Sequence, residues 1–372
     1  MRLVCDVGEA PTDWSSLLRS ADRQCSLHQT EFRARYLAES AGVTPYYLRV
    51  MDGDVPVASL LCFERRPFYR TTPKSMQKIS SLITGSSKGV IEWIEGPIFY
   101  REDKVIRVLE LFLSWMKEQF NSKGLNRIHC SGLPLFSEYV DSDSVDKVFE
   151  KFGFSRSIWA TYLVDLSVGE EVLWRKIKSS ARKSIGRCIK ESVTVRRLAS
   201  FEEFRHSFYT SYCQAEAEGG RTAGPLERYE ILFKEDVEGV YSFWLAETED
   251  GKPLATLGTF KIGSVATEIA SSTLNLARVM KLGAQDFLHW KIFISLMQEG
   301  CTTFNLAGVS PNPQNPKEAG IRRFKEKWSG EYIEYARYDL NSLHSRMVQS
   351  IAQKVSNSNA LRHVCQRMGL SA

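Results

Sequence analysis

An internal repeat constrains the fold of this sequence more than any other feature. Residues Tyr46 to Arg65 alternate apolar and polar side chains around the turn Asp52-Gly53, and Tyr241 to Ile262 do the same around Asp250-Gly251. Alternation around Asp-Gly predicts a β-hairpin, because that turn needs residues with positive φ. We therefore expect one such hairpin in each half of the chain.

The segments after the two hairpins repeat as well. A strand and then an amphipathic helix are predicted at 90–99 and 105–119 in the first half, and at 266–273 and 285–299 in the second. Gly124 and Gly300 are placed to end these helices. Each glycine also begins a segment of the same length, GLNRIHCSG in the first half and GCTTFNLAG in the second, and each segment predicts a short strand. The period is too long for a solenoid, so we expect two copies of one α/β unit.

Composition agrees with a globular protein of about two domains. Hydrophobic residues make up 43% and charged residues 25% of the 372 residues. No apolar run approaches the ~18 residues of a membrane span, and the first residues lack the apolar core of a signal peptide. We therefore expect a cytoplasmic protein. The eight cysteines form no C-x-x-C pair, which favours reduced core cysteines, and no metal site is predicted.

Positive charge is concentrated in one segment, although the formal net charge is only +5. Residues 170–191 predict a single amphipathic helix whose apolar stripe is Leu173, Ile177, Ala181, Ile185 and Ile189. Nine basic residues and one acid lie between 175 and 197. Such a face suits a polyphosphate backbone, and a solvated helix face is the alternative. The candidate residues for binding such a backbone are Arg175, Lys176, Lys178, Arg182, Lys183, Arg187 and Lys190, with Arg322 and Arg323 from a second basic segment.

Most catalytic motifs can be set aside. A G-x-S-x-G sequence at 85–89 precedes a strand instead of following one, which favours a flexible loop over a nucleophile elbow. Neither a P-loop nor a G-x-G-x-x-G fingerprint is present. One segment remains: a strand ends at Gly308, a Pro/Asn-rich loop follows, and residues 320–325 (GIRRFK) open a short helix. Ligands of α/β folds usually bind after the carboxyl end of a strand.

The GI-x-x-FK segment at 320–325 resembles the Fem family of aminoacyl-tRNA-dependent peptidyltransferases. The basic helix containing Ser180 to Ile185 (SARKSI), the WIEGP sequence at 93–97 and KFGFS at 151–155 are similar to further family landmarks. The resemblance extends to about Leu340. It implies an α/β fold with two tandem GNAT-like domains at 1–165 and 166–330, residues 331–340 returning to the first domain as a strand, and a basic helical tail at 341–372.

The resemblance also implies roles for individual residues. Lys325 would be the functional lysine beside the acceptor and the tRNA 3′ end, with Phe324 packing at the site. Tyr229 matches a tyrosine that helps bind the acceptor. Pro225 stands where the family has the companion arginine, so Arg221 or Arg228 would have to replace it. The family's phosphate-contacting lysine has no counterpart at 29–37, where only Arg33 and Arg35 are available, which weakens the case for a nucleotide-linked acceptor.

The expected activity is amide formation between the amino acid of an aminoacyl-tRNA and an amine acceptor, either a peptidoglycan-type stem peptide or a small-molecule or peptide product. The ester is already activated, so no cofactor is expected. An acyl-coenzyme A-dependent N-acyltransferase is the alternative, although 278–287 lacks the first glycine of the usual pyrophosphate loop. A non-catalytic tRNA- or RNA-binding protein is a third possibility.

Overall fold

The computed structural model describes residues 1–21, 26–65, 89–132, 142–218, 222–235, 239–343 and 346. The loop at 85–88, Arg221 and almost all of the expected tail at 341–372 lie outside the described residues.

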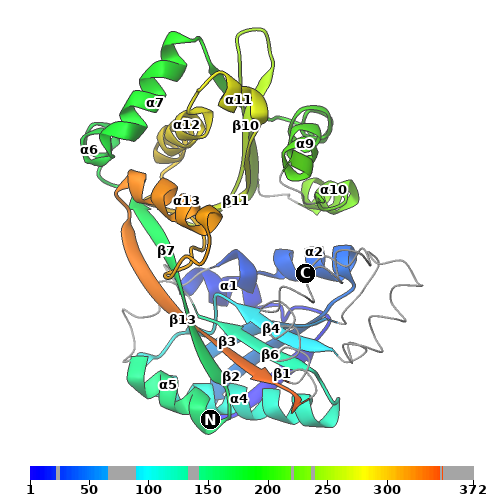
Figure 1. Ribbon diagram of the computed structural model, residues 1–372. Coiled ribbons are helices and arrows are strands. Elements are labelled where there is room, and N and C mark those ends of the chain that lie inside the picture. Colours follow the sequence, from blue (N-terminus) through cyan, green and yellow to red (C-terminus); the bar gives the residue numbers. More distant parts are fainter. Residues whose placement is uncertain are drawn as a thin grey trace, which may run out of the picture.

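Two lobes are joined by a pair of long strands, β7 (Ser155–Asp165) and β13 (Glu331–Asn341) (Figure 1). All the described strands belong to one continuous sheet, in the order β1-β2-β3-β4-β6-β13-β7-β12-β11-β10-β9-β8, with β5 paired to β3. The N-terminal half of β13 pairs with β7, and its C-terminal end also pairs with β6 of the first lobe. The sheet therefore runs from one lobe into the other without interruption.

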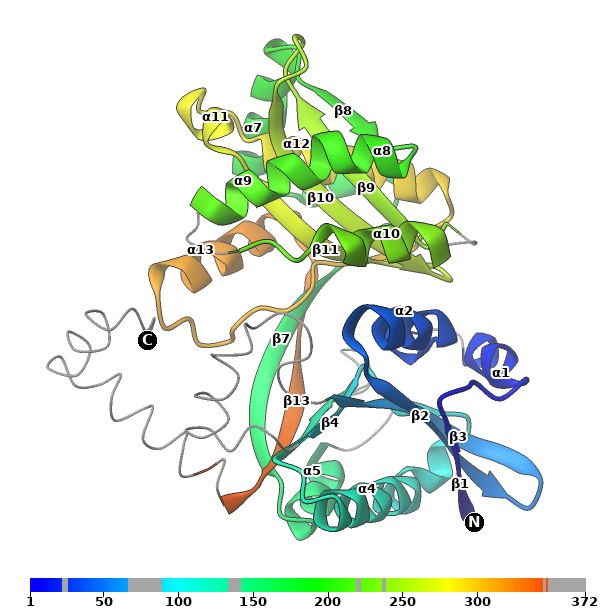
Figure 2. The same cartoon turned by 90° about the vertical axis from the view of Figure 1, so that its right-hand side faces the viewer.

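The N-terminal lobe carries helices on both faces of its strands (Figure 2). Its strands are β1 (Arg2–Val7), β2 (Thr44–Asp52), β3 (Val55–Arg65), β4 (Val90–Ile94), β5 (Ile98–Phe99) and β6 (Arg127–Ser131). Helices α1 (Trp14–Ser20) and α2 (Glu31–Ala41), with the turn η2 (Leu27–Gln29), cover one face. The other face is covered by α4 (Val105–Ser122), which follows η3 (Glu102–Lys104), and by α5 (Ser142–Lys151).

The C-terminal lobe repeats this arrangement. Its strands are β8 (Thr194–Arg197), β9 (Tyr241–Glu247), β10 (Pro253–Ile262), β11 (Val265–Thr273) and β12 (Thr303–Asn305). One face carries α6 (Glu170–Lys176), α7 (Ser179–Lys190) and α12 (Ala284–Gln298), preceded by α11 (Asn275–Val279). The other carries α8 (Phe201–Glu203), the π-helical η5 (Phe204–Tyr209), α9 (Thr210–Glu218) and α10 (Leu226–Glu235). Helix α13 (Pro316–Lys325) and η6 (Glu326–Trp328) lie where the lobes meet.

The repeat predicted from sequence is confirmed. Strands β2 and β3 form the first hairpin and β9 and β10 the second, with Gly53 and Gly251 at positive φ. The helices α4 and α12 follow as predicted, and Gly124 and Gly300 after them are left-handed. The expected strand 90–99 is wrong as one element, because Glu95 at φ 52° and the cis bond Gly96-Pro97 divide it into β4 and β5.

Two helix predictions also need correction. The single helix at 170–191 is broken, because Ile177 and Lys178 are extended and the Lys178 N–H donates to the Lys327 carbonyl (2.9 Å). Ile189, assigned to the buried stripe, is 60% exposed, and Cys188 is buried instead. The GIRRFK segment ends α13 rather than opening it, since the helix starts at Pro316 behind its N-cap Asn315.

Candidate functional site

The candidate site lies where two parallel strands separate. Strands β11 and β12 pair only through Val265–Thr267 and Thr303–Asn305. Beyond this point β11 continues to Thr273 with β10 on one side and without β12 on the other. A cleft of about 1030 Å³ lies at this opening. Its wall includes Glu268 and Ser271 of β11, Gln285 of α12, Gly308 after β12, and Phe324 and Lys325 of α13.

Lys325 is held in the wall of the cleft by backbone carbonyls. Its side chain is 6% exposed, and its Nζ donates to the carbonyl oxygens of Ala307 (3.0 Å) and Gly308 (2.9 Å). Ala307 is left-handed (φ 60°), and its N–H donates to the Asn305 side-chain oxygen (2.9 Å). Because a lysine ammonium has three donors, two remain fixed and a third is available to a ligand.

A buried carboxylate and a buried imidazole stand beside this lysine. Glu268 accepts a hydrogen bond from the Ser271 hydroxyl (2.6 Å), and its other oxygen lies 3.2 Å from His289 Nε2. The Nδ1 of His289 lies 2.8 Å from the carbonyl oxygen of Gln285, which can only accept, so Nδ1 carries a hydrogen. His289 is fully buried and stacks on Trp328. Oε2 of Glu268 and Nε2 of His289 face each other within hydrogen-bond distance.

The charges in this cluster shift two pKa values. Burial lowers the pKa of Lys325 below its usual value, and the opposite charge of Glu268 offsets part of that shift. Burial by itself would raise the pKa of Glu268, but the hydrogen bond and charge of His289, together with Lys325, lower it overall. Glu268 is therefore an ionised acceptor inside a largely enclosed site.

Two further groups complete the wall. Phe324 contacts the edge of the His289 ring, with the ring centroids 5.1 Å apart, and so packs at the site. The Gln285 amide nitrogen is buried and has no hydrogen-bond partner among the described residues. A buried donor in a ligand-sized cleft is suited to bind an acceptor on a ligand.

The acceptor residues expected from the resemblance lie elsewhere. Tyr229 and Arg228 are on α10, and neither is among the described residues that line the cleft. Tyr229 packs in an aromatic cluster with Phe204, Tyr209 and Tyr212, and burial raises its pKa. Arg221 lies outside the described residues.

Most of the predicted basic residues are exposed: Arg175, Lys176, Lys178, Lys183, Arg187, Lys190 and Arg323. Among these, Arg187 donates to the Met280 carbonyl (3.1 Å) and Lys178 pairs with Glu326 (3.6 Å). Arg182 instead donates to the carbonyl oxygens of Trp174 (3.1 Å) and Arg175 (3.3 Å), and so satisfies the end of α6. Arg322 bonds Glu326 (3.2 Å) and the Pro311 carbonyl (2.6 Å), which ties α13 to the preceding loop.

Helix α7 closes the N-terminus of α12. A Cβ placed on the N-cap residue Gly283 would lie 2.4 Å from the Ser184 Cβ. Nearby, Lys327 bonds both carboxylate oxygens of the buried Asp286 (3.0 Å each). Ser184 and the Lys327–Asp286 ion pair therefore lie close to the N-terminus of α12.

Sequence reasoning missed Glu268 and His289. Both lie in stretches that read as ordinary strand or helix, and only the separation of β11 from β12 brings them to Lys325. The available signal was the polarity of these two residues: Glu268 is the only charged residue of β11, and His289 interrupts an apolar run of α12.

No protein-family model and no curated protein matches the chain. Solved structures show that the fold is that of a tandem GNAT protein, as predicted. FemX has a TM-score of 0.68 at 12% identity, covering 93% of this chain and 99% of its own. A tandem GNAT protein from the clavulanic acid biosynthesis pathway has a TM-score of 0.56 at 10% identity (91% and 98%). The C-terminal domain of a putative lysylphosphatidylglycerol synthetase from Agrobacterium fabrum has a TM-score of 0.52 at 13% identity, covering 91% of this chain and 96% of its own.

The predicted resemblance to the Fem family is thus confirmed at the level of the fold. None of the described helices is long and apolar enough to cross a membrane.

Proposed function

We propose that this protein is an aminoacyltransferase that moves an amino acid from aminoacyl-tRNA to an amine, on a peptidoglycan-type stem peptide or on a small-molecule or peptide product. The observation that carries the proposal is the cluster of Lys325, Glu268 and His289 in a cleft where two parallel strands separate. The chemistry belongs to the second domain, which we propose spans 166–330, while 1–165 with 331–340 forms the first.

The mechanism uses the groups of the cleft in order. Glu268, ionised and supported by His289, accepts a proton from the acceptor amine. The amine nitrogen attacks the ester carbonyl carbon, and the third Nζ–H of Lys325 donates to the developing oxyanion. The C–N bond then forms as the C–O bond to the tRNA ribose breaks, and the ribose oxygen takes the proton from Glu268. The step needs no redox reagent, because the ester bond is consumed.

The burial of Lys325 bears on its role. A contact with a terminal tRNA phosphate requires an accessible ammonium, but this Nζ is enclosed and already bonded to two carbonyl oxygens. This geometry suits the oxyanion better than the phosphate.

The close packing of α7 against the N-terminus of α12 weighs against acyl-coenzyme A as the donor. A pyrophosphate bound at a helix N-terminus needs free backbone N–H groups. Here Ser184 of α7 packs against Gly283, and the exposed lysines of α7 lie on the outside of the lobe. These lysines suit the phosphates of a tRNA acceptor stem.

The test uses the full chain with a pool of aminoacyl-tRNAs carrying radiolabelled amino acids, and with labelled acetyl-coenzyme A as a parallel donor. We expect saturable retention of particular aminoacyl-tRNAs at about 0.15 M salt, a concentration at which non-specific phosphate binding is weakened. Addition of an amine acceptor should release deacylated tRNA. Acyl transfer from coenzyme A alone would overturn the choice of donor, and tRNA binding without Lys325-dependent transfer would indicate an RNA-binding protein.

A further inference from the structure

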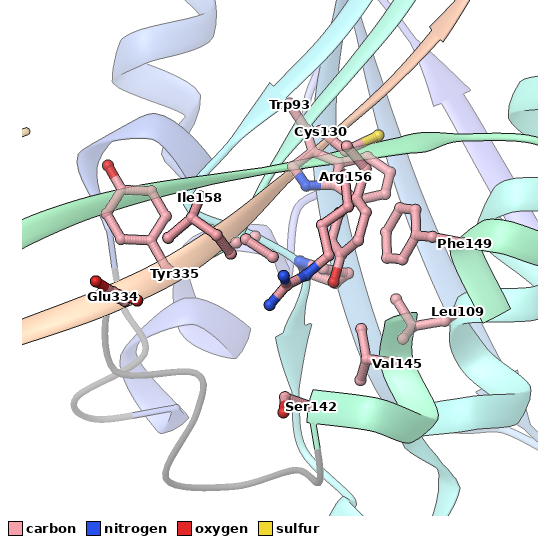
Figure 3. Close-up of a pocket in the computed structure, with 15 residues that line it drawn as sticks. Trp93, Leu109, Cys130, Ser142, Val145, Phe149, Arg156, Ile158, Glu334 and Tyr335 are labelled. Atoms are coloured by element: carbon pink, nitrogen blue, oxygen red, sulfur yellow. The ribbon is translucent and has the colours of Figure 1, made fainter. Parts of the chain in front are cut away.

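The N-terminal lobe contains a second pocket at the corresponding place in its own fold. A cavity of about 220 Å³ lies at the carboxyl ends of the parallel strands β4 and β6. Figure 3 shows Leu109, Val145 and Phe149 of the helices on one side, and Ile158 and Tyr335 of the long strands on the other. Trp93 and Cys130 close the end between them.

The two pockets correspond residue by residue. Pairing of the parallel strands begins at Val90 with Arg127 in one lobe and at Val265 with Thr303 in the other. Five residues beyond these starts, Glu95 and Ala270 both have positive φ, which shows that the two backbones follow the same path. The second strand of each pair is followed by a matching glycine. Gly132 lies five residues beyond Arg127 and lines the first pocket, and Gly308 lies five residues beyond Thr303 and lines the second.

This correspondence pairs three polar groups at the catalytic cleft, Glu268, Gln285 and His289, with apolar ones. Trp93 occupies the place of Glu268. Leu109 occupies the place of Gln285, since each lies 15 residues before the glycine that follows its helix, and by the same count Leu113 occupies the place of His289. The N-terminal pocket therefore lies at the same place in its lobe as the catalytic cleft, but it has no counterpart of Glu268, the proposed proton acceptor.

The pocket nevertheless presents one unused polar group. Trp93 is 1% exposed, and its indole Nε1 has no hydrogen-bond partner among the described residues. Buried donors are nearly always paired, so an acceptor oxygen on a ligand is the expected partner. Arg156 at the wall is engaged with Asp146 (2.9 Å), so its charge is already balanced.

We propose that this pocket is a non-catalytic binding site for a compact, uncharged aromatic or branched group that carries one acceptor oxygen, such as an aryl ketone or ester. Its size agrees, because an engineered cavity of ~150 Å³ lined by apolar side chains binds benzene, and this one has room for a ring with a short substituent. The wall is mostly apolar and also includes Ser142, Arg156 and Glu334. An apolar lining with a small number of polar groups is typical of small-molecule sites. The proposal does not depend on the identity of the acyl donor.

The experiment observes the tryptophan indole N–H signals of the full chain labelled with ¹⁵N-tryptophan, with Trp93→Phe used to assign the Trp93 signal. The probe is acetophenone, and α-methylstyrene is the matched control, since it has the same shape without the oxygen. Benzoate tests whether the site prefers an anion. We expect a saturable shift of the Trp93 signal with acetophenone, and at least several-fold weaker binding of both other compounds.

Two variants locate the binding. Val145→Phe fills the cavity, and Leu109→Gln introduces the residue found at the same place in the catalytic cleft. In either variant, if thermal unfolding shows that it is folded, acetophenone binding should fall at least tenfold. If neither variant folds, calorimetry can measure the affinity of Trp93→Phe for the two neutral probes. Because this variant lacks the indole N–H, it should bind acetophenone no more tightly than α-methylstyrene. No saturable shift up to the solubility limit, equal binding of the two neutral probes to the unmodified chain, or tighter binding of benzoate would overturn the proposal.

Discussion

At the scale of single residues, the site depends on charged groups that the fold has largely removed from water. Lys325 is enclosed, bonded to two carbonyl oxygens, and close enough to Glu268 for the two charges to interact. In such surroundings a charge acts more strongly on a nearby reacting atom than it would in water.

Replacing Lys325 tests its role directly. Lys325→Met keeps the aliphatic stem but removes the donor, and we expect kcat to fall by about 10²–10³-fold, as for loss of one oxyanion donor. Single-turnover assays with saturating aminoacyl-tRNA measure this. Lys291→Met is the control, because Lys291 is exposed on α12 and is not among the described residues that line the cleft. Turnover unchanged in Lys325→Met would exclude the oxyanion role.

The pH dependence follows from the two shifted pKa values. The pKa of Glu268 is lowered, so the base should stay ionised, and kcat should hold, to a pH below the usual 4.5 of glutamate. The pKa of Lys325 is also lowered, so the ammonium should be lost, and kcat should fall, at a pH below its usual 10.5. A kcat–pH profile measures both limbs. In Lys325→Arg any remaining activity should persist to higher pH, and an alkaline limb that does not move would show that another group titrates there.

At the scale of elements, helix α7 has two separate faces with separate tasks. Its inner face packs on α12, where Ser184 contacts Gly283. Its outer face exposes Lys183, Arg187 and Lys190. The predicted stripe failed only at Ile189, because a strict i, i+4 spacing advances by about 40° per step around a helix with ~3.6 residues per turn, so that Cys188 faces the core instead.

Neutralising exposed lysines of α6 and α7 should weaken tRNA binding without changing the chemistry. Lys176, Lys183 and Lys190 are all exposed, and their joint replacement by Gln should lower the slope of log K against log salt by about 2 to 3, at ~0.9 per phosphate contact. Filter binding from 0.05 to 0.2 M salt measures the slope. The matched control removes the same charge from the other lobe, at Arg107, Lys147 and Lys151. Equal loss in both triple variants would mean that net charge alone attracts the tRNA.

At the scale of the whole molecule, β13 returns from the second lobe and is fastened to the first. Asp339 accepts hydrogen bonds from Arg127 (2.7 Å) and His129 (2.9 Å) of β6. Burial by itself would raise the pKa of Asp339, but these two partners lower it overall. The ion pair thus joins strands that are more than 200 residues apart in the sequence.

Removing this carboxylate should loosen the connection between the lobes. Asp339→Asn should reduce the free energy of unfolding at pH 7 by about 1–3 kcal/mol, the range for hydrogen bonds to charged groups. Because the folded carboxyl has the lower pKa, its contribution is present above the usual 3.8 and is lost as the pH falls through the folded value. Urea unfolding at pH 7 and pH 3 measures both effects. Glu331 is exposed at the other end of the strand, so Glu331→Gln should change the free energy of unfolding little. If the loss of stability in Asp339→Asn were larger at pH 3 than at pH 7, the ion pair would not be its cause.

The sequence by itself determined the repeat, both hairpins, the helices α4 and α12 and the importance of the segment around Lys325. These features are local: turn glycines, apolar periodicity and a short motif act within a few residues of chain. The tertiary structure alone decided which polar groups meet. Glu268, His289 and Lys325 come from a strand, a helix and a second helix, and the division of the repeat into one polar cleft and one apolar pocket depends on side chains that face each other only after the sheet has formed.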